Sequence, residues 1–271
     1  MALLRGRTVK LAWATDIHLD HCDEARIAAF VEQLRGAQAL ALTGDLSEAP
    51  QLRGHLEQLA TALTCPIYFI LGNHDYYHGS IQAVREQMRD LSAISPWLRW
   101  LPAGGIVPLS AQTCILGHDS WGDGRNGDVI NSWVKLKDFR LIEDFVTAGE
   151  AGRVALLNNL GDEAAAYLAP LLPQALSCYR HVILLMHPPP LQEACLYGSE
   201  IADDNWAPHF TCKAVGDLLL ETLPKHPQTQ VTVLAGHTHN ICDIQPLPNL
   251  RICVGAAEYG QPALAGSFEI N

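Results

Sequence analysis

Five stretches of the chain are almost entirely apolar, and each one ends abruptly at polar residues. They cover residues 11–15, 39–43, 67–71, 182–186 and 231–235. Short apolar runs that end at turn residues are typical of strands buried on both faces. Asp, Asn or His follows each of these runs, directly or after a single glycine. We therefore expect five buried strands whose polar end residues gather along one edge of a sheet.

Segments with a helical spacing of apolar residues separate the first three of these strands. The spacing predicts helices at residues 23–34 and 50–63, and a weaker pattern predicts a third helix at 79–91. Pro50 stands in the first turn of the second helix, where a missing backbone N–H is tolerated. Because strands and helices alternate, we expect parallel strands joined by right-handed crossovers.

The second half of the chain has a less regular pattern. It predicts a hairpin at residues 105–109 and 112–116, followed by a helical middle segment of about 129–180 with helices at 134–148 and 159–179. A further helix is predicted at 213–223, and three final strands at 241–246, 250–254 and 264–270 form an antiparallel finish. The proline- and acid-rich connection at 188–211 is long for a loop, and loops of that length often form lids or binding surfaces. We therefore expect a lid-like loop there.

No change in composition marks a linker, so we expect a single domain over residues 1–271. Hydrophobic residues make up 48% and charged residues 17%, as in ordinary globular proteins. No apolar run approaches the roughly 20 residues that a membrane-spanning helix needs. Residues 1–7 lack the features of a signal peptide. Together these features predict a soluble, cytoplasmic protein that does not associate with a membrane.

Eight cysteines are scattered along the chain without any C-x-x-C pair. Several of them stand in apolar surroundings, as Cys114 and Cys253 do. We expect reduced thiols that pack as small apolar side chains, rather than disulfides or a zinc site.

The formal net charge is −11, from 18 basic and 29 acidic residues, and the lysines and arginines form no cluster. A nucleic-acid backbone would find little positive charge to bind. The charge therefore argues against duplex DNA or RNA as the main partner.

Eight polar residues follow the five predicted strands, and seven of them suffice to bind metal through oxygen or imidazole nitrogen. They are Asp16, His18, Asp45, Asn73, His74, His187, His237 and His239. Residues two apart in an extended segment point the same way, so both members of Asp-x-His and His-x-His can reach one centre. No cysteine is among them, which favours divalent Mn, Fe, Zn or Ni over a structural thiolate zinc site.

The same residues form a series of short motifs in a fixed order. The motifs are Asp16-x-His18, Gly44-Asp45, Gly72-Asn73-His74-Asp75, His187 after an apolar strand, and Gly236-His237-x-His239. In this order they resemble the motif set of the calcineurin-like metallophosphoesterases, over residues 16–239 of the chain. The resemblance implies the α/β fold of that family, a four-layer α/β/β/α sandwich with two central mixed β-sheets.

The resemblance also implies a two-metal site with a water or hydroxide between the ions as the nucleophile. Asp16, His18 and His239 would bind one ion, Asn73, His187 and His237 the other, and Asp45 would bridge them. His74 would protonate the leaving group. Glu48 stands where many relatives have an aspartate that orients this histidine, so it either takes that role or is a helix N-cap or solvated residue.

Such a site would attract anions although the chain is acidic. Two divalent ions and the two carboxylates Asp16 and Asp45 leave a local charge of about +2. The expected partner is therefore a small phosphorylated substrate.

Three further residues are candidates for substrate binding. Arg125 and Trp121 belong to a glycine-rich loop that offers a guanidinium for phosphate and an aromatic wall, or simply forms a surface turn. His209 in the lid-like loop would hydrogen-bond a phosphate or lie exposed. We expect Asp75 to be a turn residue without a chemical role, and the histidines outside the motifs to be ordinary polar residues.

The predicted function is metal-dependent hydrolysis of a small phosphodiester or phosphomonoester. Three alternatives stay open: a nuclease of the same chemistry, a non-catalytic scaffold that keeps the fold, and a protein phosphatase. The missing basic track argues against the nuclease, and the complete set of presumed ligands argues against the scaffold. Arginines expected after the second and third motifs of a protein phosphatase are replaced by Ala49-Pro50 and Tyr76-Tyr77.

Overall fold

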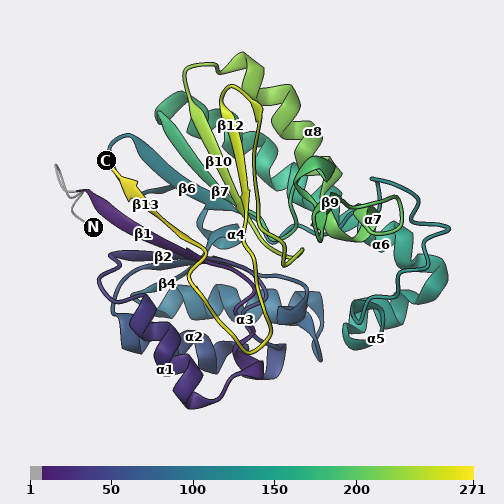
Figure 1. Ribbon diagram of the computed structural model, residues 1–271, viewed down its shortest axis with the longest axis horizontal. Helices are drawn as coiled ribbons and strands as arrows, with labels where there is room; N and C mark the ends of the chain where they lie inside the picture. Colours follow the sequence, from purple (N-terminus) through teal and green to yellow (C-terminus); the bar gives the residue numbers. More distant parts are fainter. Residues whose placement is uncertain (1–7) are drawn as a thin grey trace.

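Two mixed β-sheets lie face to face at the centre of the molecule, with helices on their outer faces (Figure 1). This computed structural model describes residues 8–271 of the chain. The prediction of no signal peptide concerns residues 1–7, which lie outside the described residues. The expected four-layer α/β/β/α sandwich is confirmed.

The first sheet has the strand order β13-β1-β2-β3-β4. Its strands are β1 (Val9–Ala14), β2 (Ala39–Thr43), β3 (Ile67–Ile70), β4 (Leu98–Trp100) and β13 (Gly266–Ile270). Strands β1 to β4 are parallel, and β13 pairs antiparallel with β1. The edge strand β4 was not predicted, because three residues interrupted by Arg99 give no readable apolar run.

The second sheet has the strand order β11-β12-β10-β7-β6-β5. Its strands are β5 (Val107–Pro108), β6 (Thr113–Gly117), β7 (His181–Leu185), β10 (Gln230–Ala235), β11 (Cys242–Leu247) and β12 (Leu250–Val254). The four central strands are parallel, whereas β5 and β11 pair antiparallel at the two edges. The predicted hairpin at 105–116 is thus confirmed as β5 and β6.

Helices cover the outer face of each sheet. On the first sheet lie α1 (Glu24–Gln33), α2 (Ala49–Leu63) and α3 (Ile81–Ile94), and on the second lie α6 (Glu143–Cys178) and α8 (Lys213–Thr222). Polar side chains cap the N-termini of α1 and α3. The side chain of Asp23 accepts a hydrogen bond from the Arg26 N–H, and that of Ser80 accepts one from the Ala83 N–H. The helices predicted at 23–34, 50–63, 79–91 and 213–223 are confirmed.

Apolar side chains fill three layers between these elements. One layer joins α1–α3 to the first sheet, a second lies between the two sheets, and a third joins the second sheet to α6 and α8. The middle layer contains Trp13 from the first sheet and Leu185 from the second, both almost fully buried. Strands β1, β2, β7 and β10 are therefore buried on both faces, as their uninterrupted apolar runs predicted.

The helical middle segment differs from the prediction in detail. Residues 129–137 are not helical, and α5 (Asp138–Leu141) is a single turn. Helix α6 runs on to residue 178 with one break, at Gly149, whose φ of 63° ends the first part. The predicted gap between 148 and 159 was therefore wrong, because helix resumes directly after that glycine. No helix in residues 8–271 has the length and apolar character needed to cross a membrane.

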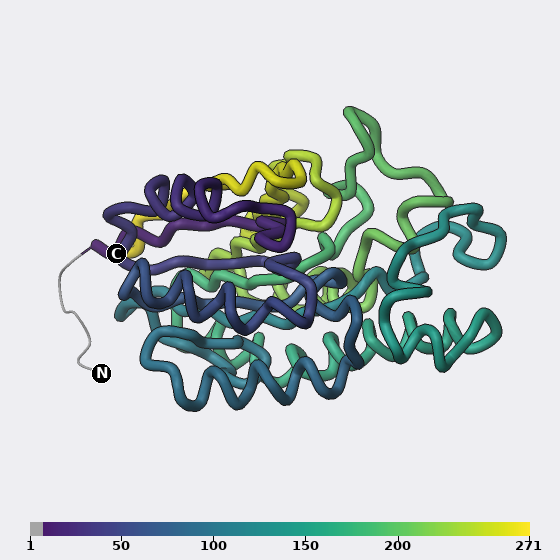
Figure 2. Tube along the Cα trace, turned by 90° about the horizontal axis from the view of Figure 1, so that it is seen from below, coloured from purple at the N-terminus to yellow at the C-terminus, as the bar shows by residue number. Residues whose placement is uncertain are grey.

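The connection at 188–211 is folded rather than loose. It contains the 3-10 helix η3 (Gln192–Ala194), a small hairpin of β8 (Leu196–Tyr197) and β9 (Glu200–Ile201), and the short helix α7 (Ala207–Phe210). Figure 2 shows this connection and the segment around α5 on the same side of the molecule, beyond the ends of the strands. The remaining short elements are η1 (Leu19–His21), η2 (His74–Tyr76), α4 (Leu101–Gly104) and η4 (Leu223–Lys225).

Burial of the cysteines follows the prediction in most cases. Six of the eight are buried, Cys22 is half-buried and Cys178 is exposed, and all eight are free thiols. The prediction that the cysteines pack as small apolar side chains is therefore confirmed except at Cys22, which lies between η1 and α1, and Cys178, which ends α6.

Candidate metal centre

The loops after β1, β2, β7 and β10 bring aspartates and histidines together in two groups. Ligand atoms of the first group lie within 4.8 Å of one another, and so do those of the second. The groups are Asp16, His18, Asp45 and His239, and Asp45, His187 and His237. Asp45 belongs to both groups, so its carboxylate is placed to bind two cations at once.

Asn73, from the loop after β3, joins the second group. Its Oδ1 lies 3.1 Å from Nε2 of His187. Its Nδ2 donates a hydrogen bond of 2.9 Å to Oδ1 of Asp138, which also accepts one from the Tyr77 hydroxyl. Because an amide donates through nitrogen and accepts through oxygen, Asp138 turns the Asn73 oxygen towards the centre. Asp138 stands in no motif, and sequence reasoning missed it.

Five of the seven expected ligand residues have a left-handed backbone, which is uncommon outside glycine. Their φ angles are 49° at Asp16, 38° at His18, 52° at Asp45, 71° at His237 and 57° at His239. Backbone hydrogen bonds hold these turns: the Asp16 N–H donates to the Gly44 carbonyl and the His18 N–H to the Asp45 carbonyl, both at 3.0 Å. Strain that the surroundings enforce in this way is characteristic of functional sites.

Gly72 makes room for this packing. A Cβ atom there would collide with Oδ1 of Asp45 and lie 2.6 Å from Cε1 of His187. The glycine of the third motif is therefore required by close approach of two neighbouring loops.

The imidazole rings are oriented by carbonyl groups. Nδ1 of His187 lies 2.8 Å from the Thr43 carbonyl oxygen, and Nε2 of His237 lies 3.1 Å from that of His209. Because a carbonyl oxygen only accepts, each of these nitrogens carries the proton. The other nitrogen of each ring is then free to bind a cation, an arrangement typical of metal-binding histidines.

The charges of the centre fit bound cations. Burial alone raises the pKa of Asp45, but the positive charge that His187 and His74 can carry holds it well below its usual value. Burial lowers the pKa of His18 to about 4 and that of His237 to about 3, so both rings are neutral at pH 7. Neutral imidazoles and ionised carboxylates are the protonation states that metal binding requires.

His187 lies beside the shared carboxylate of Asp45. Burial lowers its pKa, but the negative charge of Asp45 outweighs burial and raises it to about 10. Among residues 8–271, no lysine or arginine forms an ion pair with Asp16 or Asp45. The carboxylates of the centre thus attract positive charge, and the oxygen and nitrogen donors suit Mn, Fe, Zn or Ni.

His74 lies at the edge of the two groups. Its Nε2 is 4.0 Å from Oδ2 of Asp45 and 3.4 Å from the hydroxyl of Tyr259. Its Nδ1 is buried without a hydrogen-bond partner among the described residues. Tyr259 was also missed by sequence reasoning, because it belongs to the long connection between β12 and β13 and to none of the motifs.

Glu48 does not contact His74, and its place in the structure agrees with the second of its two expected roles, that of an N-cap or solvated residue. Its carboxylate lies 3.5 Å from Nε2 of His78, and no hydrogen bond or ion pair joins it to His74 in the described chain. It occupies the N-cap position of α2 but makes no side-chain capping hydrogen bond. These contacts therefore give no support to the role of orienting His74.

Asp75 has a larger structural role than a simple turn residue. Its Oδ1 accepts hydrogen bonds of 2.7 and 2.9 Å from the N–H groups of Leu46 and Ser47, and its Oδ2 accepts one of 2.7 Å from Gly72. Burial, together with the nearby charge of Asp45, raises its pKa well above the ordinary value. Asp75 therefore joins the loops that carry Asp45 and Asn73.

The glycine-rich loop after β6 contacts the centre differently from the prediction. The Arg125 guanidinium pairs with Asp123 at 3.2 Å and Asp162 at 2.8 Å, so the expected phosphate contact is not supported. Trp121 is buried and packs against Tyr76, with ring centroids 5.4 Å apart. It reaches the centre only at a cavity of about 10 Å³, too small for a substrate.

His209 contributes its backbone rather than its ring. Its Nε2 lies 3.1 Å from the Ser132 hydroxyl, and its buried ring packs against Phe139. The predicted contact between this imidazole and a phosphate is therefore not supported. Its carbonyl instead orients His237. The carbonyl has room at this position because Gly122 has no Cβ atom, and any Cβ atom there would overlap it.

Solved structures with the same fold include a hydrolase and a dimetal phosphatase. Phosphopantetheinyl hydrolase (PptH) from Mycobacterium tuberculosis is similar with a TM-score of 0.68 and 15% identity, over 94% of this chain and 92% of that one. A dimetal phosphatase from Danio rerio is similar with a TM-score of 0.56 and 14% identity, over 92% and 87%. GAP50, the anchor in the inner membrane complex of Plasmodium, has a TM-score of 0.50 and 10% identity, over 91% and 71%. At these identities the likeness concerns the fold.

No curated protein matches the sequence significantly. The model of the calcineurin-like phosphoesterase family, in contrast, matches residues 9–240. This range contains β1 to β10 and every motif residue of the two clustered groups. The chain belongs to the calcineurin-like phosphoesterase family.

Proposed function

We propose that this protein hydrolyses a small phosphodiester or phosphomonoester with the help of two divalent cations. The observation that carries the proposal is the pair of ligand groups that share Asp45, placed within a protein of the phosphoesterase family. His74 beside the shared carboxylate supplies a group that can move a proton.

Seven residues would hold the cations. Asp16, His18 and His239 would bind one, Asn73, His187 and His237 the other, and Asp45 both. When bound, the cations supply positive charge for the phosphoryl oxygens and make a water acidic enough to act as the nucleophile. The protein keeps the ligand atoms in place through the carbonyls of Thr43 and His209 and the carboxylate of Asp138.

His74 is suited to protonate the leaving group. Its Nε2 lies within 4.0 Å of Asp45 and 3.4 Å of the hydroxyl of Tyr259, a residue that lines the adjoining cavity. The ring is held between His18 and Tyr77, with centroid distances of 4.6 and 4.3 Å. A ring fixed in this way can donate a proton from Nε2 without first having to be ordered.

A small substrate fits the charge of the surroundings. The residues that line the cavity beside His237 and His239 include no lysine or arginine. A polyanion such as a nucleic acid would meet the net charge of −11 without a basic track to offset it. This observation favours a small ester over the nuclease, and the complete ligand set favours an enzyme over a scaffold such as an anchor protein.

The proposal is tested by hydrolysis of bis-para-nitrophenyl phosphate and of the monoester para-nitrophenyl phosphate. Metal-stripped protein is measured alone and after addition of manganese, beside the variants Asp45→Asn and His74→Ala. We expect turnover that depends on added metal and falls at least about 100-fold in both variants. The ratio of the two rates assigns the diester or the monoester class.

The two variants separate two roles. Asp45→Asn should lose bound metal as well as activity, whereas His74→Ala should keep its metal and lose only turnover. Absence of turnover with any of manganese, iron, zinc or nickel, on either ester, would contradict the proposal and favour the non-catalytic scaffold.

A further inference from the structure

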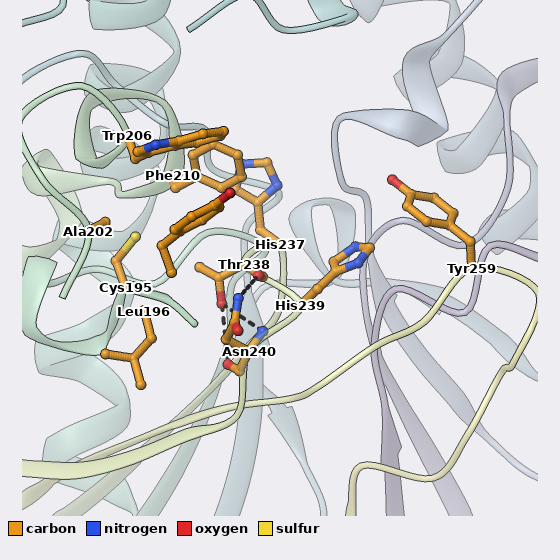
Figure 3. Close-up of a pocket in the computed structure, with 11 residues that line it drawn as sticks. Cys195, Leu196, Ala202, Trp206, Phe210, His237, Thr238, His239, Asn240 and Tyr259 are labelled. Atoms are coloured by element: carbon orange, nitrogen blue, oxygen red, sulfur yellow. Dashed lines mark hydrogen bonds between the residues drawn. The ribbon is translucent and has the colours of Figure 1, made fainter. Parts of the chain in front are cut away.

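A second cavity adjoins the candidate metal centre. It has a volume of about 250 Å³, and His237 and His239 form part of its wall. Figure 3 shows Trp206 and Phe210 on one side, Tyr259 on the other, and the two histidines between them. Any group bonded to a phosphate at the centre can therefore enter this cavity without crossing a layer of protein.

One wall of the cavity is a continuous row of aromatic rings. Tyr197 stacks on Trp206 with centroids 4.7 Å apart and an interplanar angle of 17°. Trp206 contacts Phe210 at 5.6 Å, and Phe210 stacks on His237 at 4.5 Å and 27°. The row thus runs from a candidate ligand of the metal outwards to the surface. All its members except His237 come from the connection at 188–211.

The rest of the lining is uncharged. Leu196, Cys195 and Ala202 contribute apolar atoms, and no lining residue is an aspartate, glutamate, lysine or arginine. Tyr197 is 60% exposed and Tyr259 is 48% exposed, so large aromatic surfaces face the opening. An open, apolar and aromatic cavity whose lining has no lysine or arginine is suited to a planar ring and offers no counter-charge to a second phosphate.

The size of the cavity limits its occupant. Pockets that enclose whole drug-sized molecules measure roughly 300–1,000 Å³. A volume of about 250 Å³ therefore suits one ring system rather than an extended chain with several polar groups.

We propose that this cavity binds the organic group of the phosphoester, and that this group is an uncharged planar ring of the aryl or nucleobase kind. The inference rests on the proposed function, since it places the phosphate at the candidate metal centre. The stacked pair of Trp206 and Tyr197 lies against the ring, and Tyr259 closes the opposite side. The connection at 188–211 thereby determines substrate choice, while the strand-end residues carry out the hydrolysis.

Three phosphonates test the proposal without requiring turnover. Benzylphosphonate carries a planar ring, cyclohexylmethylphosphonate carries a saturated ring of similar size, and methylphosphonate carries neither. Binding of each to the manganese-loaded protein is measured by calorimetry. We expect benzylphosphonate to bind about tenfold more tightly than methylphosphonate, and several-fold more tightly than the cyclohexylmethyl compound, because stacking adds to burial.

Two variants test the aromatic wall, and a third is the control. Trp206→Leu and Tyr197→Ala should each reduce the preference for benzylphosphonate over methylphosphonate to about threefold or less, with methylphosphonate affinity unchanged. Ile201→Ala removes an exposed apolar side chain from the same hairpin, outside the cavity, and should keep the full preference. Tyr197 is largely exposed, so its removal does not endanger folding.

The outcomes separate this inference from the proposed function. Equal binding of the benzyl and cyclohexylmethyl compounds, or a preference that survives both wall variants, overturns the aromatic subsite while the metal centre stands. Failure of all three phosphonates to bind the metal-loaded protein overturns the metal centre and the subsite together.

Discussion

The candidate metal centre and the aromatic cavity adjoin each other, but the protein builds them in different ways. Strand ends carry the centre, and its residues are buried, held by backbone hydrogen bonds and packed so closely that Gly72 leaves no room for a Cβ atom. The cavity is lined largely by one connection, whose exposed rings contact one another. The proposed chemistry thus lies on the rigid scaffold, and the proposed substrate choice lies on a segment that can vary. Substitutions should therefore be costly in the centre and mild in the cavity.

The largest effect is expected at the tightest contact of the centre. Gly72→Ala places a methyl group against Asp45 and His187, so the loops after β2 and β3 must separate. We expect a loss of about 3 kcal/mol in the free energy of unfolding and loss of metal binding. Urea denaturation of the metal-free protein and metal analysis after dialysis measure the two effects.

A second glycine provides the matched control. Gly54 lies within α2, and a Cβ atom there meets nothing within 4 Å. Gly54→Ala should stabilise the protein by roughly 0.5–1 kcal/mol, because alanine favours the helix. Equal stability of the two variants would show that the centre is not tightly packed.

The next effect concerns a residue that touches the centre only through Asn73. Asp138→Ala removes the acceptor that orients the Asn73 amide. We expect metal affinity to fall about 10- to 100-fold, as is usual when a partner of a metal ligand is lost. Calorimetric titration with manganese measures the affinity. The control is Asp128→Ala, which also removes one carboxylate but at an exposed position, and it should leave the affinity unchanged. Unchanged affinity in Asp138→Ala would mean that the amide needs no such support.

A third prediction concerns a strand end that is not part of the centre. His118 follows β6 and is buried, with Nδ1 accepting a hydrogen bond from the Ser120 N–H. Burial lowers its pKa in the folded protein to about 4, from an unfolded value of 6.5. Because the folded pKa is lowered, the contribution of His118 to stability is complete above pH 6.5 and is lost as the pH falls towards 4.

This loss amounts to about 2 kcal/mol between pH 7 and pH 5. Urea denaturation of the metal-free protein at pH 7 and pH 5 measures this loss in the free energy of unfolding. The same measurement on His118→Asn should give a smaller loss between the two pH values, by about 2 kcal/mol. Parallel pH dependence of the two proteins would contradict the assignment.

The smallest effect is expected where the two regions meet. Tyr259→Phe removes the hydroxyl that lies 3.4 Å from Nε2 of His74 but keeps the ring that faces the cavity. We expect kcat to fall only about two- to fivefold with KM unchanged, because the hydroxyl aids the proton donor without replacing it. Tyr197→Phe, which keeps the aromatic row, should change neither constant. A rise in KM in Tyr259→Phe would place its hydroxyl in substrate binding instead.

The polar residues at the strand ends were predictable because their information is local. An apolar run that stops at Asp, Asn or His specifies both a buried strand and a side chain at its end. Parallel strands then bring these ends to one edge whatever the details of the loops. This explains why all seven expected ligand residues lie together although they come from five separate motifs.

Sequence reasoning was least informative where a residue's role depends on a distant partner. Arg125 could be recognised as a guanidinium near glycines, but its pairing with Asp162, 37 positions away, could not. His209 contributes a carbonyl, which every residue has, so no side-chain pattern marks it. Asp138 and Tyr259 reach the centre from segments without a motif.

The sequence by itself determined the family, the layers of the fold and the residues that meet at the strand ends. Only the tertiary structure decided which groups orient them, where Glu48 and Arg125 find their partners, and that an aromatic row continues from His237 to the surface. The physical reason is the separation along the chain between the residues that interact. Strand formation and its end residues follow from neighbours in the chain, whereas hydrogen-bond partners and cavity walls arise when segments far apart in sequence pack against one another.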